Sequence, residues 1–311
     1  MSAPRRPPRR NVDGVLLLDK PSGISSNGAL GRVKRLYNPA KAGHTGTLDP
    51  LASGLLPICL GAATRFAQFL LDAHKRYTAT VRFGITTTTQ DADGDIVLSR
   101  AVAIDRAAFD AVLSNLAGRQ MQLPPAHSAL KYAGKPYYHY ARQGIEIPRV
   151  AREVWIHRLE LLAWNTPDAT LDVECSKGTY VRALAADLGE ALGCGAHLAA
   201  LRRTASGGFS VADAVTLEAL EGWSEAERDQ RLLPMAVLVA HLPQLKVTAD
   251  VSRRFLQGRA VPAEGLQPGP VAVFDGESLL GVADVADGVA QPRRVISDSA
   301  APGTEAVKFE P

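Results

Sequence analysis

The amino-acid sequence predicts an α+β fold, in which a mixed sheet is followed by a small β-rich C-terminal domain. Candidate strands and helices follow one another without the regular strand–helix–strand repeat of a doubly wound parallel sheet. Residues 75–84, KRYTATVRFG, alternate apolar and polar side chains, as a half-exposed strand does. After about residue 245 the chain becomes rich in Gly, Pro and Val, and short strands dominate.

The composition is that of a mildly basic chain with few cysteines. Across 311 residues, 35 lysines and arginines face 32 aspartates and glutamates, which permits a nucleic-acid partner without requiring one. The three cysteines form no C-x-x-C pair, so neither a disulfide framework nor a cysteine zinc site is expected. The apolar run at 15–18 is too short for a signal peptide or a membrane span. We therefore expect a cytoplasmic protein without a membrane partner.

The first third of the chain predicts two strands and two helices. Residues 15–21, VLLLDKP, form a short apolar run that ends in proline, as a buried strand does. Ser25 or Ser26 then caps a helix with one apolar face. Residues 55–60 are apolar enough for a second strand, and 62–75 predict a helix.

The remaining elements are predicted from caps, alternation and turns. A helix is expected over Asp105–Ala117 with Asp105 as its cap, and a strand over 171–175. Residues 179–193 predict a strong helix that stops at Gly193. Residues 271–285 predict a hairpin that turns at Asp275-Gly276.

One loop, GHTGTLDPLASGLLP at 43–57, holds a single carboxylate, Asp49, in a run of glycines and prolines. Gly43 and Gly46 supply unusual backbone angles, and Pro50 ends any helix at Asp49. As structure alone, Asp49 caps the short segment that follows it. As chemistry, a rigid loop aims one carboxylate, with His44 nearby. These residues alone leave both interpretations open.

A second segment, KYAGKPYYHYARQG at 131–144, interleaves lysine and arginine with four of the chain's seven tyrosines. Proteins that bind single-stranded RNA stack bases on aromatic rings and hold the backbone with basic side chains. The alternative is an amphipathic helix with half-buried tyrosines.

Arg182 stands at the start of the predicted helix 179–193, where a positive charge opposes the helix dipole. This placement indicates that Arg182 has a partner, for which a carboxylate is the natural candidate. The alternative is an ordinary surface arginine.

Several familiar chemistries lack their motifs. QDADGD at 90–95 lacks the glycine and glutamate positions of a calcium loop. The sequence holds no P-loop, no G-x-S-x-G and no H-E-x-x-H motif. We therefore expect neither a metal nor a nucleotide cofactor.

Six motifs, taken together and in order, resemble those of the bacterial tRNA pseudouridine-55 synthases, the TruB-type family. They are LDKPSGISS, GHTGTLDPLASGLLP, KRYTATVRFG, PPAHSALK, SKGTYVRALAADLG and HLAALRRT, spread over roughly residues 12–210. The basic, proline-rich start of the chain predicts a disordered tail over 1–11, and the resemblance implies a catalytic domain over 12–245. It also implies an RNA-clamping thumb at about 124–150 and an RNA-binding domain of the PUA type over 246–311.

By this resemblance the protein isomerises uridine 55 in the T loop of tRNA after flipping the base, and also assists tRNA folding. It would bind the T stem-loop without a cofactor, a guide RNA or an obligate protein partner. Asp49 would be the catalytic aspartate, and Arg182 would pair with it. The other implied substrate-binding residues are His44, Tyr77, Tyr180, Leu201 and Lys20.

The sequence leaves the first chemical step open. Asp49 attacks carbon 1′ of the ribose, adds to the base, or abstracts a ribose proton. Three other functions compete with the stand-alone enzyme: a catalytic subunit that needs a guide RNA and protein partners, an RNA chaperone with incidental chemistry, and a glycosidase with paired carboxylates. No second carboxylate stands in a motif comparable to that of Asp49, which ranks the glycosidase last.

Overall fold

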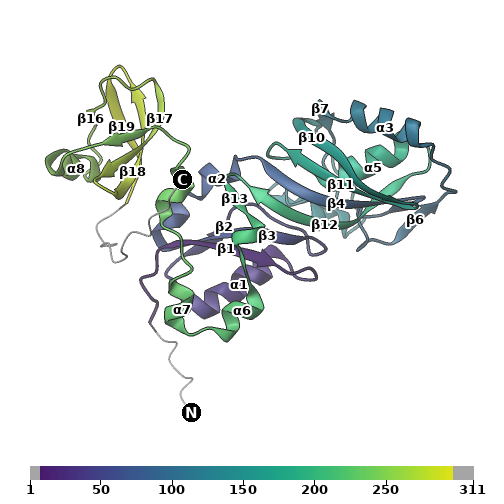
Figure 1. Ribbon diagram of the computed structural model, residues 1–311, viewed down its shortest axis with the longest axis horizontal. Helices are drawn as coiled ribbons and strands as arrows, with labels where there is room; N and C mark the ends of the chain where they lie inside the picture. The colour runs from purple at the N-terminus through teal and green to yellow at the C-terminus, as the bar shows by residue number, and fades with distance from the viewer. Residues whose placement is uncertain (1–7, 297–311) are drawn as a thin grey trace, which may run out of the picture.

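A computed structural model describes residues 8–296, and it is built on one ten-stranded mixed sheet (Figure 1). Eight strands follow the order β14-β1-β3-β12-β4-β11-β10-β7, while β2 pairs with β3 and β13 pairs with β12. Two pairs, β1 with β14 and β12 with β3, are parallel, and the other neighbours are antiparallel. The predicted α+β class with a mixed sheet is confirmed. The strands of this sheet are β1 Gly14–Lys20, β2 Ala42–His44, β3 Ser53–Leu60, β4 Lys75–Phe83, β7 Gly118–Gln122, β10 Arg152–Asn165, β11 Asp168–Cys175, β12 Ala196–Ser206, β13 Phe209–Ser210 and β14 Val215–Thr216.

Short helices cover the sheet in two groups (Figure 1). One group, α1 with α6 and α7, lies by β1 and β3, and the other, α3 with α5, lies by β4, β10, β11 and β12. Within the described residues, no helix is long and apolar enough to cross a membrane. The helices outside the C-terminal domain are α1 Ser26–Tyr37, η1 Gly61–Arg65, α2 Ala67–Leu71, α3 Arg106–Asn115, α4 Tyr137–Ala141, α5 Val181–Ala191, η2 Val211–Asp213, α6 Leu217–Gly222, α7 Glu225–Asp229 and η3 Met235–Val239.

The strand β1 is buried on both faces, which explains its continuous apolar run. Leu16 and Leu18 belong to the main core with α1, whereas Val15 and Leu17 pack with η1 and η3 on the opposite face. Strands buried on both sides read as unbroken apolar runs rather than as alternating ones. The same is true of its antiparallel partner β3, so the two strands fix the loop between β2 and β3 in space.

The alternation predicted for 75–84 is present in β4. Tyr77, Ala79, Val81 and Phe83 are buried in the main core, while the intervening side chains are half-buried or exposed. β4 lies between β12 and β11 near the middle of the sheet, with Tyr77 opposite Arg203 and Val173. The strand therefore delivers Tyr77 to the helix-covered face close to the start of α5.

The C-terminal part is a separate five-stranded sheet, in the order β15-β17-β18-β19-β16, with one helix. The predicted hairpin is present, with Gly276 at a φ of 56° between β17 and β18. Because the sheet begins at Gln244, we propose that the domain boundary lies about two residues before the predicted Lys246. Its elements are β15 Gln244–Lys246, α8 Ala249–Leu256, β16 Val261–Pro262, β17 Gly269–Asp275, β18 Ser278–Ala286 and β19 Val289–Val295.

Two sequence expectations need correction. The tail expected to be disordered over 1–11 is ordered from residue 8, because Arg10 donates its backbone N–H to Asn38 O and forms ion pairs with Glu225 and Asp229. Residues 1–7 and 297–311, which complete the predicted tail and C-terminal domain, lie outside the described residues. The single helix expected over 62–75 is instead η1 followed by α2, and Lys75 already belongs to β4.

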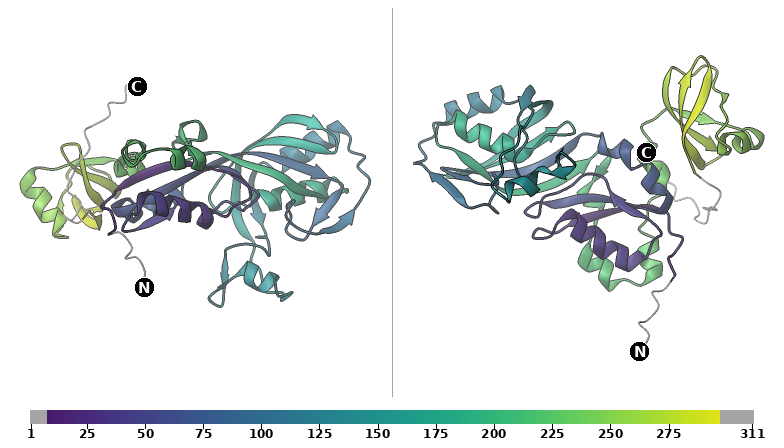
Figure 2. Two further views of the ribbon diagram at one scale, coloured as in Figure 1. Left: turned by 90° about the horizontal axis from the view of Figure 1, so that it is seen from below. Right: turned by 180° about the vertical axis from the view of Figure 1, so that it is seen from behind.

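The segment 124–150 projects from the body of the molecule (Figure 2). It holds a small hairpin, β8 Lys131–Tyr132 and β9 Lys135–Pro136, and the five-residue helix α4. The long amphipathic helix considered for 131–144 does not form, because the hairpin turn places Ala133 and Gly134 at positive φ. A second hairpin, β5 Ile85–Thr87 with β6 Ile96–Ser99, carries the segment 88–95.

Candidate active site

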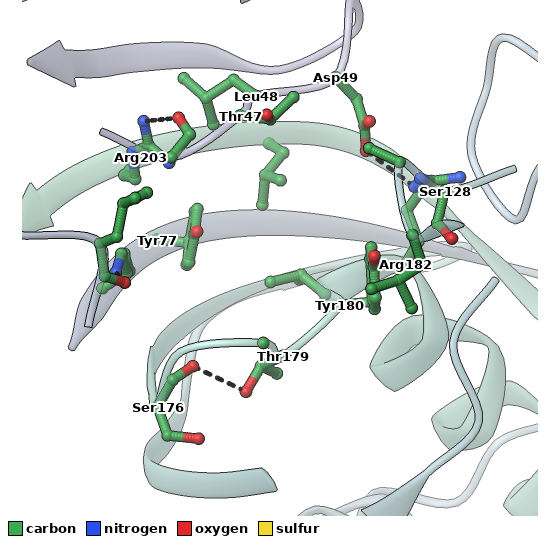
Figure 3. Close-up of a pocket in the computed structure, with 18 of the residues that line it drawn as sticks. Thr47, Leu48, Asp49, Tyr77, Ser128, Ser176, Thr179, Tyr180, Arg182 and Arg203 are labelled. Atoms are coloured by element: carbon green, nitrogen blue, oxygen red, sulfur yellow. Dashed lines mark hydrogen bonds and ion pairs between the residues drawn. The ribbon is translucent and has the colours of Figure 1, made fainter. Parts of the chain in front are cut away.

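A pocket of about 360 Å³ opens where the loop 46–49, the strands β4 and β12, and the start of α5 meet (Figure 3). This volume suits one small ligand. The residues that line it include four of the predicted site residues besides Asp49, which are Tyr77, Tyr180, Arg182 and Leu201.

The loop that carries Asp49 is anchored at its centre by a buried serine of α1. The Ser26 hydroxyl accepts the backbone N–H of Leu48 at 2.8 Å and donates to the carbonyl of Leu48 at 3.0 Å. On the other side of Asp49, the carbonyl of Pro50 accepts the N–H of Gly23 at 2.8 Å. Asp49 is therefore held between two fixed residues.

A buried arginine of β12 ties the two ends of the same loop together. Arg203, 1% exposed, donates from Nε to Leu55 O at 2.7 Å and from Nη2 to Gly46 O at 3.0 Å. Gly54 sits against it: a Cβ atom there would lie 2.3 Å from Arg203 O, and its φ is +100°. Of the two glycines expected to supply unusual angles, Gly46 has a positive φ of +113°, whereas Gly43 does not.

Asp49 forms an ion pair with Arg182 across the pocket (Figure 3). Arg182 Nε lies 2.9 Å from Asp49 Oδ2, the Arg182 side chain is 4% exposed, and that of Asp49 is 39% exposed. Partial burial raises the pKa of Asp49 above its usual value, and the Arg182 guanidinium opposes that rise. The pairing expected from the sequence is thus present, and the catalytic role of Asp49 stays a prediction.

A second carboxylate, Asp91, approaches the same guanidinium and was missed by sequence reasoning. Its Oδ2 lies 3.5 Å from Arg182 Nε, and its side chain is 5% exposed. The Asp91 carboxylate also accepts the hydroxyl of Thr89 and the backbone N–H of Asp93. It belongs to QDADGD, the segment dismissed as an incomplete calcium loop. One sequence signal could have identified Asp91: the segment 90–95 is rich in carboxylates but lacks the spacing of a metal site.

Two carbonyl groups complete the surroundings of Arg182. Nη1 donates to Thr89 O at 2.8 Å, and Nη2 donates to His127 O at 2.9 Å. From the first turn of α5, the guanidinium therefore contacts two separate segments, 89–91 and the one that holds His127, as well as facing Asp49. This set of partners explains why an arginine is placed against the helix dipole.

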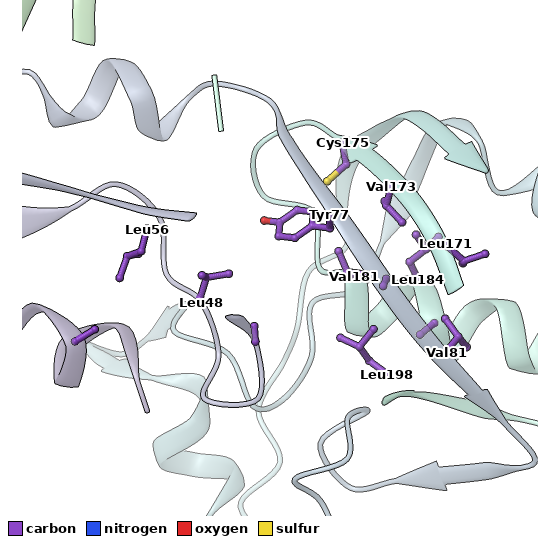
Figure 4. Packing of buried hydrophobic residues seen from close by; sticks show 14 of the residues in the cluster. Leu48, Leu56, Tyr77, Val81, Leu171, Val173, Cys175, Val181, Leu184 and Leu198 are labelled. Atoms are coloured by element: carbon purple, nitrogen blue, oxygen red, sulfur yellow. The ribbon is translucent and has the colours of Figure 1, made fainter. Parts of the chain in front are cut away.

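Apolar side chains form the floor and the wall of the pocket. Tyr77, 9% exposed, lies between Leu48 and the core residues Val173 and Val181 (Figure 4). Leu201 of β12 adds to the wall. The aromatic ring and the aliphatic groups of this wall provide surfaces against which a flat ring can pack.

Tyr180 is held in place by two residues that the sequence did not indicate. Its backbone N–H donates to Gln122 Oε1 at 2.7 Å, and its carbonyl accepts Gln122 Nε2 at 3.1 Å. The guanidinium of Arg152 lies over the Tyr180 ring, 4.9 Å from its centre. Both contacts come from neighbouring strands, β7 and β10, so only the tertiary structure brings them to Tyr180.

Lys20 and His44 do not line the pocket. Lys20 is fully buried and donates to the carbonyls of Pro21 and Ile24, and burial lowers its pKa to about 8. It therefore stabilises the turn in which the N–H of Gly23 donates to the carbonyl of Pro50. His44 ends β2, and burial lowers its pKa. Its contact with RNA stays a prediction.

Among residues 8–296, no three His, Cys, Asp or Glu side chains gather in a way that could hold a metal ion.

Comparison with known proteins agrees with this geometry. The sequence profile described as "TruB family pseudouridylate synthase (N terminal domain)" matches residues 34–181. Profiles for a tRNA pseudouridylate synthase B C-terminal domain and for "Pseudouridine synthase II TruB, C-terminal" match residues 182–240 and 243–296.

Close relatives extend the match over almost the whole chain. A tRNA pseudouridine synthase B of Azoarcus sp. (strain BH72) is 55% identical over 295 residues, which is 94% of this chain and 98% of the relative. One of Burkholderia mallei (strain NCTC 10247) is 52% identical over 296 residues, covering 93% and 98%.

Solved structures show the same fold at lower identity. A chain in the crystal structure of a Cbf5-Nop10-Gar1 complex matches with a TM-score of 0.72 and 27% identity, covering 94% of this chain and 87% of that one. With the site geometry and the sequence matches in agreement, the chain belongs to the TruB family of pseudouridine synthases.

Proposed function

We propose that this protein converts uridine to pseudouridine at position 55, in the T loop of tRNA. The observation that carries the proposal is the ion pair between Asp49 and Arg182 in a pocket that Tyr77 also lines. The names of the relatives, which are tRNA pseudouridine synthases at 52–55% identity, support tRNA as the substrate.

The substrate must first leave the RNA stack to reach Asp49. Flipping a nucleotide costs a few kcal/mol, and less in a loop than in a duplex. Tyr77 offers a ring on which uracil stacks, and Leu201 offers an apolar wall. Stacking of a base on an aromatic side chain contributes about 1–3 kcal/mol, which offsets much of the cost of flipping.

The reaction is an isomerisation, so its atoms balance without a co-reactant. The bond between ribose C1′ and uracil N1 breaks, a bond between C1′ and C5 forms, and the proton on C5 is replaced by one on N1. Asp49 must be ionised to act on the nucleotide, and its partial burial works against ionisation. Arg182 keeps the carboxylate charged and fixes its direction.

We further propose that the protein acts alone, without a guide RNA or an obligate protein partner. The solved structures at 25–27% identity are a Cbf5-Nop10-Gar1 complex and H/ACA assemblies, which contain additional proteins or RNA. The relatives named tRNA pseudouridine synthase B are twice as similar and match over nearly their full length. We expect the protein to meet its tRNA in the cytoplasm.

The projecting segment 124–150 and the C-terminal sheet then provide additional RNA contacts. The segment exposes Tyr132 and Tyr138. The guanidinium of Arg142 lies 5.5 Å from the centre of the Tyr138 ring. We propose that this segment clamps the RNA as a thumb, and that residues 244–296 bind RNA as a PUA-type domain.

The test uses the purified protein alone. An unmodified tRNA transcript and a copy with cytidine at position 55 are incubated with it, and pseudouridine is mapped along each RNA. The proposal predicts one modified nucleotide, at position 55, in the first transcript only. Modification at another uridine, or none unless a guide RNA or protein is added, would contradict it.

A further inference from the structure

One hydroxyl in the wall of the pocket has no partner. Ser128 is 3% exposed and lines the pocket, and within residues 8–296 its Oγ makes no hydrogen bond. Ser176 and Thr179 line the same pocket, but the Ser176 hydroxyl accepts the N–H of Trp155 and that of Thr179 donates to Ser176 O. Buried polar atoms are nearly always paired, so an unpaired one in a binding pocket points to a ligand.

The backbone around Ser128 is held on two sides. Arg182 Nη2 donates to the carbonyl of His127 at 2.9 Å. The carbonyl of Ser128 accepts the N–H of Tyr138 at 3.1 Å, and that of Leu130 accepts the N–H of Tyr137 at 2.7 Å. Ser128 therefore lies between the catalytic ion pair and the thumb helix α4. Its backbone is held in place before RNA arrives, which lowers the entropic cost of using its side chain.

The position of Ser128 in the pocket indicates which part of the nucleotide its hydroxyl contacts. Figure 3 places Ser128 at the end of the pocket that holds Asp49 and Arg182, away from Arg203 and the floor at Tyr77. The proposed reaction requires the ribose to lie near Asp49, because the bonds that break and form are at C1′. Uracil then stacks on Tyr77. The polar group adjacent to C1′ is the ribose 2′-hydroxyl, which both donates and accepts hydrogen bonds.

We propose that Ser128 Oγ hydrogen-bonds the 2′-hydroxyl of the flipped nucleotide. This inference rests on the proposed function and extends it to substrate selection. Ser128 then distinguishes RNA from DNA at the target nucleotide. The carbonyl of Ser128 also accepts a hydrogen bond from the thumb helix α4. RNA bound by the thumb is therefore held close to the Ser128 hydroxyl.

The experiment is a thermodynamic cycle on the full-length chain. All proteins carry Asp49→Asn, which prevents turnover, and binding of a T-arm stem-loop is measured by fluorescence anisotropy. The RNA contains uridine or 2′-deoxyuridine at the target position, and the protein carries Ser128 or Ser128→Ala. Ser206→Ala is the matched control, since Ser206 is fully buried with an unpaired hydroxyl but does not line the pocket.

We expect 2′-deoxyuridine to weaken binding roughly three- to tenfold with Ser128 present, the range for one hydrogen bond. With Ser128→Ala, the two RNAs should bind equally, and Ser206→Ala should preserve the difference. A preference for uridine that survives Ser128→Ala, or that Ser206→Ala also removes, would overturn the inference alone. Absence of binding by every protein would instead overturn the proposed function, and this inference with it.

Discussion

Nε of Arg182 lies 2.9 Å from Oδ2 of Asp49, and this contact joins the first turn of α5 to the anchored loop between β2 and β3. The same atom lies 3.5 Å from Oδ2 of Asp91. One buried guanidinium thus faces two carboxylates. Its attraction lowers the pKa of Asp49, while the charge of Asp91 raises it. The two neighbours of Asp49 should therefore shift the pH dependence of turnover in opposite directions.

Replacing Arg182 with methionine should lower turnover on the order of 100-fold, because a fixed charge beside the reacting group is lost. We propose that Asp49 acts as a carboxylate, so turnover should fall as the pH drops through its pKa. Burial has already raised that pKa, and loss of Arg182 raises it further. The acidic limb of the rate profile should therefore move to higher pH. Unchanged turnover with an unshifted limb would show that Arg182 does not act on Asp49.

Replacing Asp91 with asparagine should move the acidic limb the other way. Removing the like charge lowers the pKa of Asp49, so ionisation persists to lower pH. Turnover at neutral pH should drop roughly tenfold, because Arg182 loses a charged contact that fixes its orientation. The same rate profile measures both effects. A shift of the acidic limb to higher pH would show that the charge of Asp91 does not raise the pKa of Asp49.

The serine that anchors Leu48 provides a test of loop geometry. Ser26→Ala leaves two buried backbone groups of Leu48 unpaired and should lower the free energy of unfolding by about 1–3 kcal/mol. Turnover should fall as well, because Asp49 follows Leu48 directly.

Ser25→Ala is the control for that variant. It removes the cap of α1, whose hydroxyl accepts Gly28 N at 3.0 Å, and should cost about 1 kcal/mol. Urea unfolding and turnover are measured on both proteins. Loss of turnover in proportion to stability in the two variants would mean that the anchor has no specific effect on Asp49.

Gly54 should tolerate no side chain. With Gly54→Ala, the new Cβ would collide with Arg203 O, and the φ of +100° is unfavourable for alanine. The free energy of unfolding should fall by about 2–4 kcal/mol. Gly43→Ala, in the same loop, meets nothing within 4 Å and should stay within about 0.5 kcal/mol of the wild type. Similar urea midpoints for the two variants would contradict the packing described for Arg203.

Local patterns in the sequence predicted the elements that position the site. The alternation of 75–84 predicted which face of β4 carries Tyr77, and Ser25 caps α1 as expected. Arg182 was singled out because its charge conflicts with the helix dipole, which is a local signal of a distant partner. These predictions succeeded because each depends on residues that are neighbours along the chain.

The features of the site that the sequence did not predict depend on contacts between distant segments. Asp91 reaches Arg182 across 91 residues of sequence, and Gln122 reaches Tyr180 across 58. The helix expected over 62–75 ends early because Lys75 donates to the carbonyls of Leu70, Leu71 and Ala73. That side chain terminates α2 while its backbone pairs in β4, a combination that residue propensity does not show.

The central claim is that Asp49 carries out an isomerisation that needs nothing beyond the protein and its RNA. A T-arm stem-loop with tritium at carbon 5 of its uridines tests it, since forming the bond to C5 releases that tritium to water. The wild type should release one equivalent per RNA without any added cofactor, and Asp49→Asn should release none while still binding the stem-loop. Release by Asp49→Asn at a rate near that of the wild type would contradict the account.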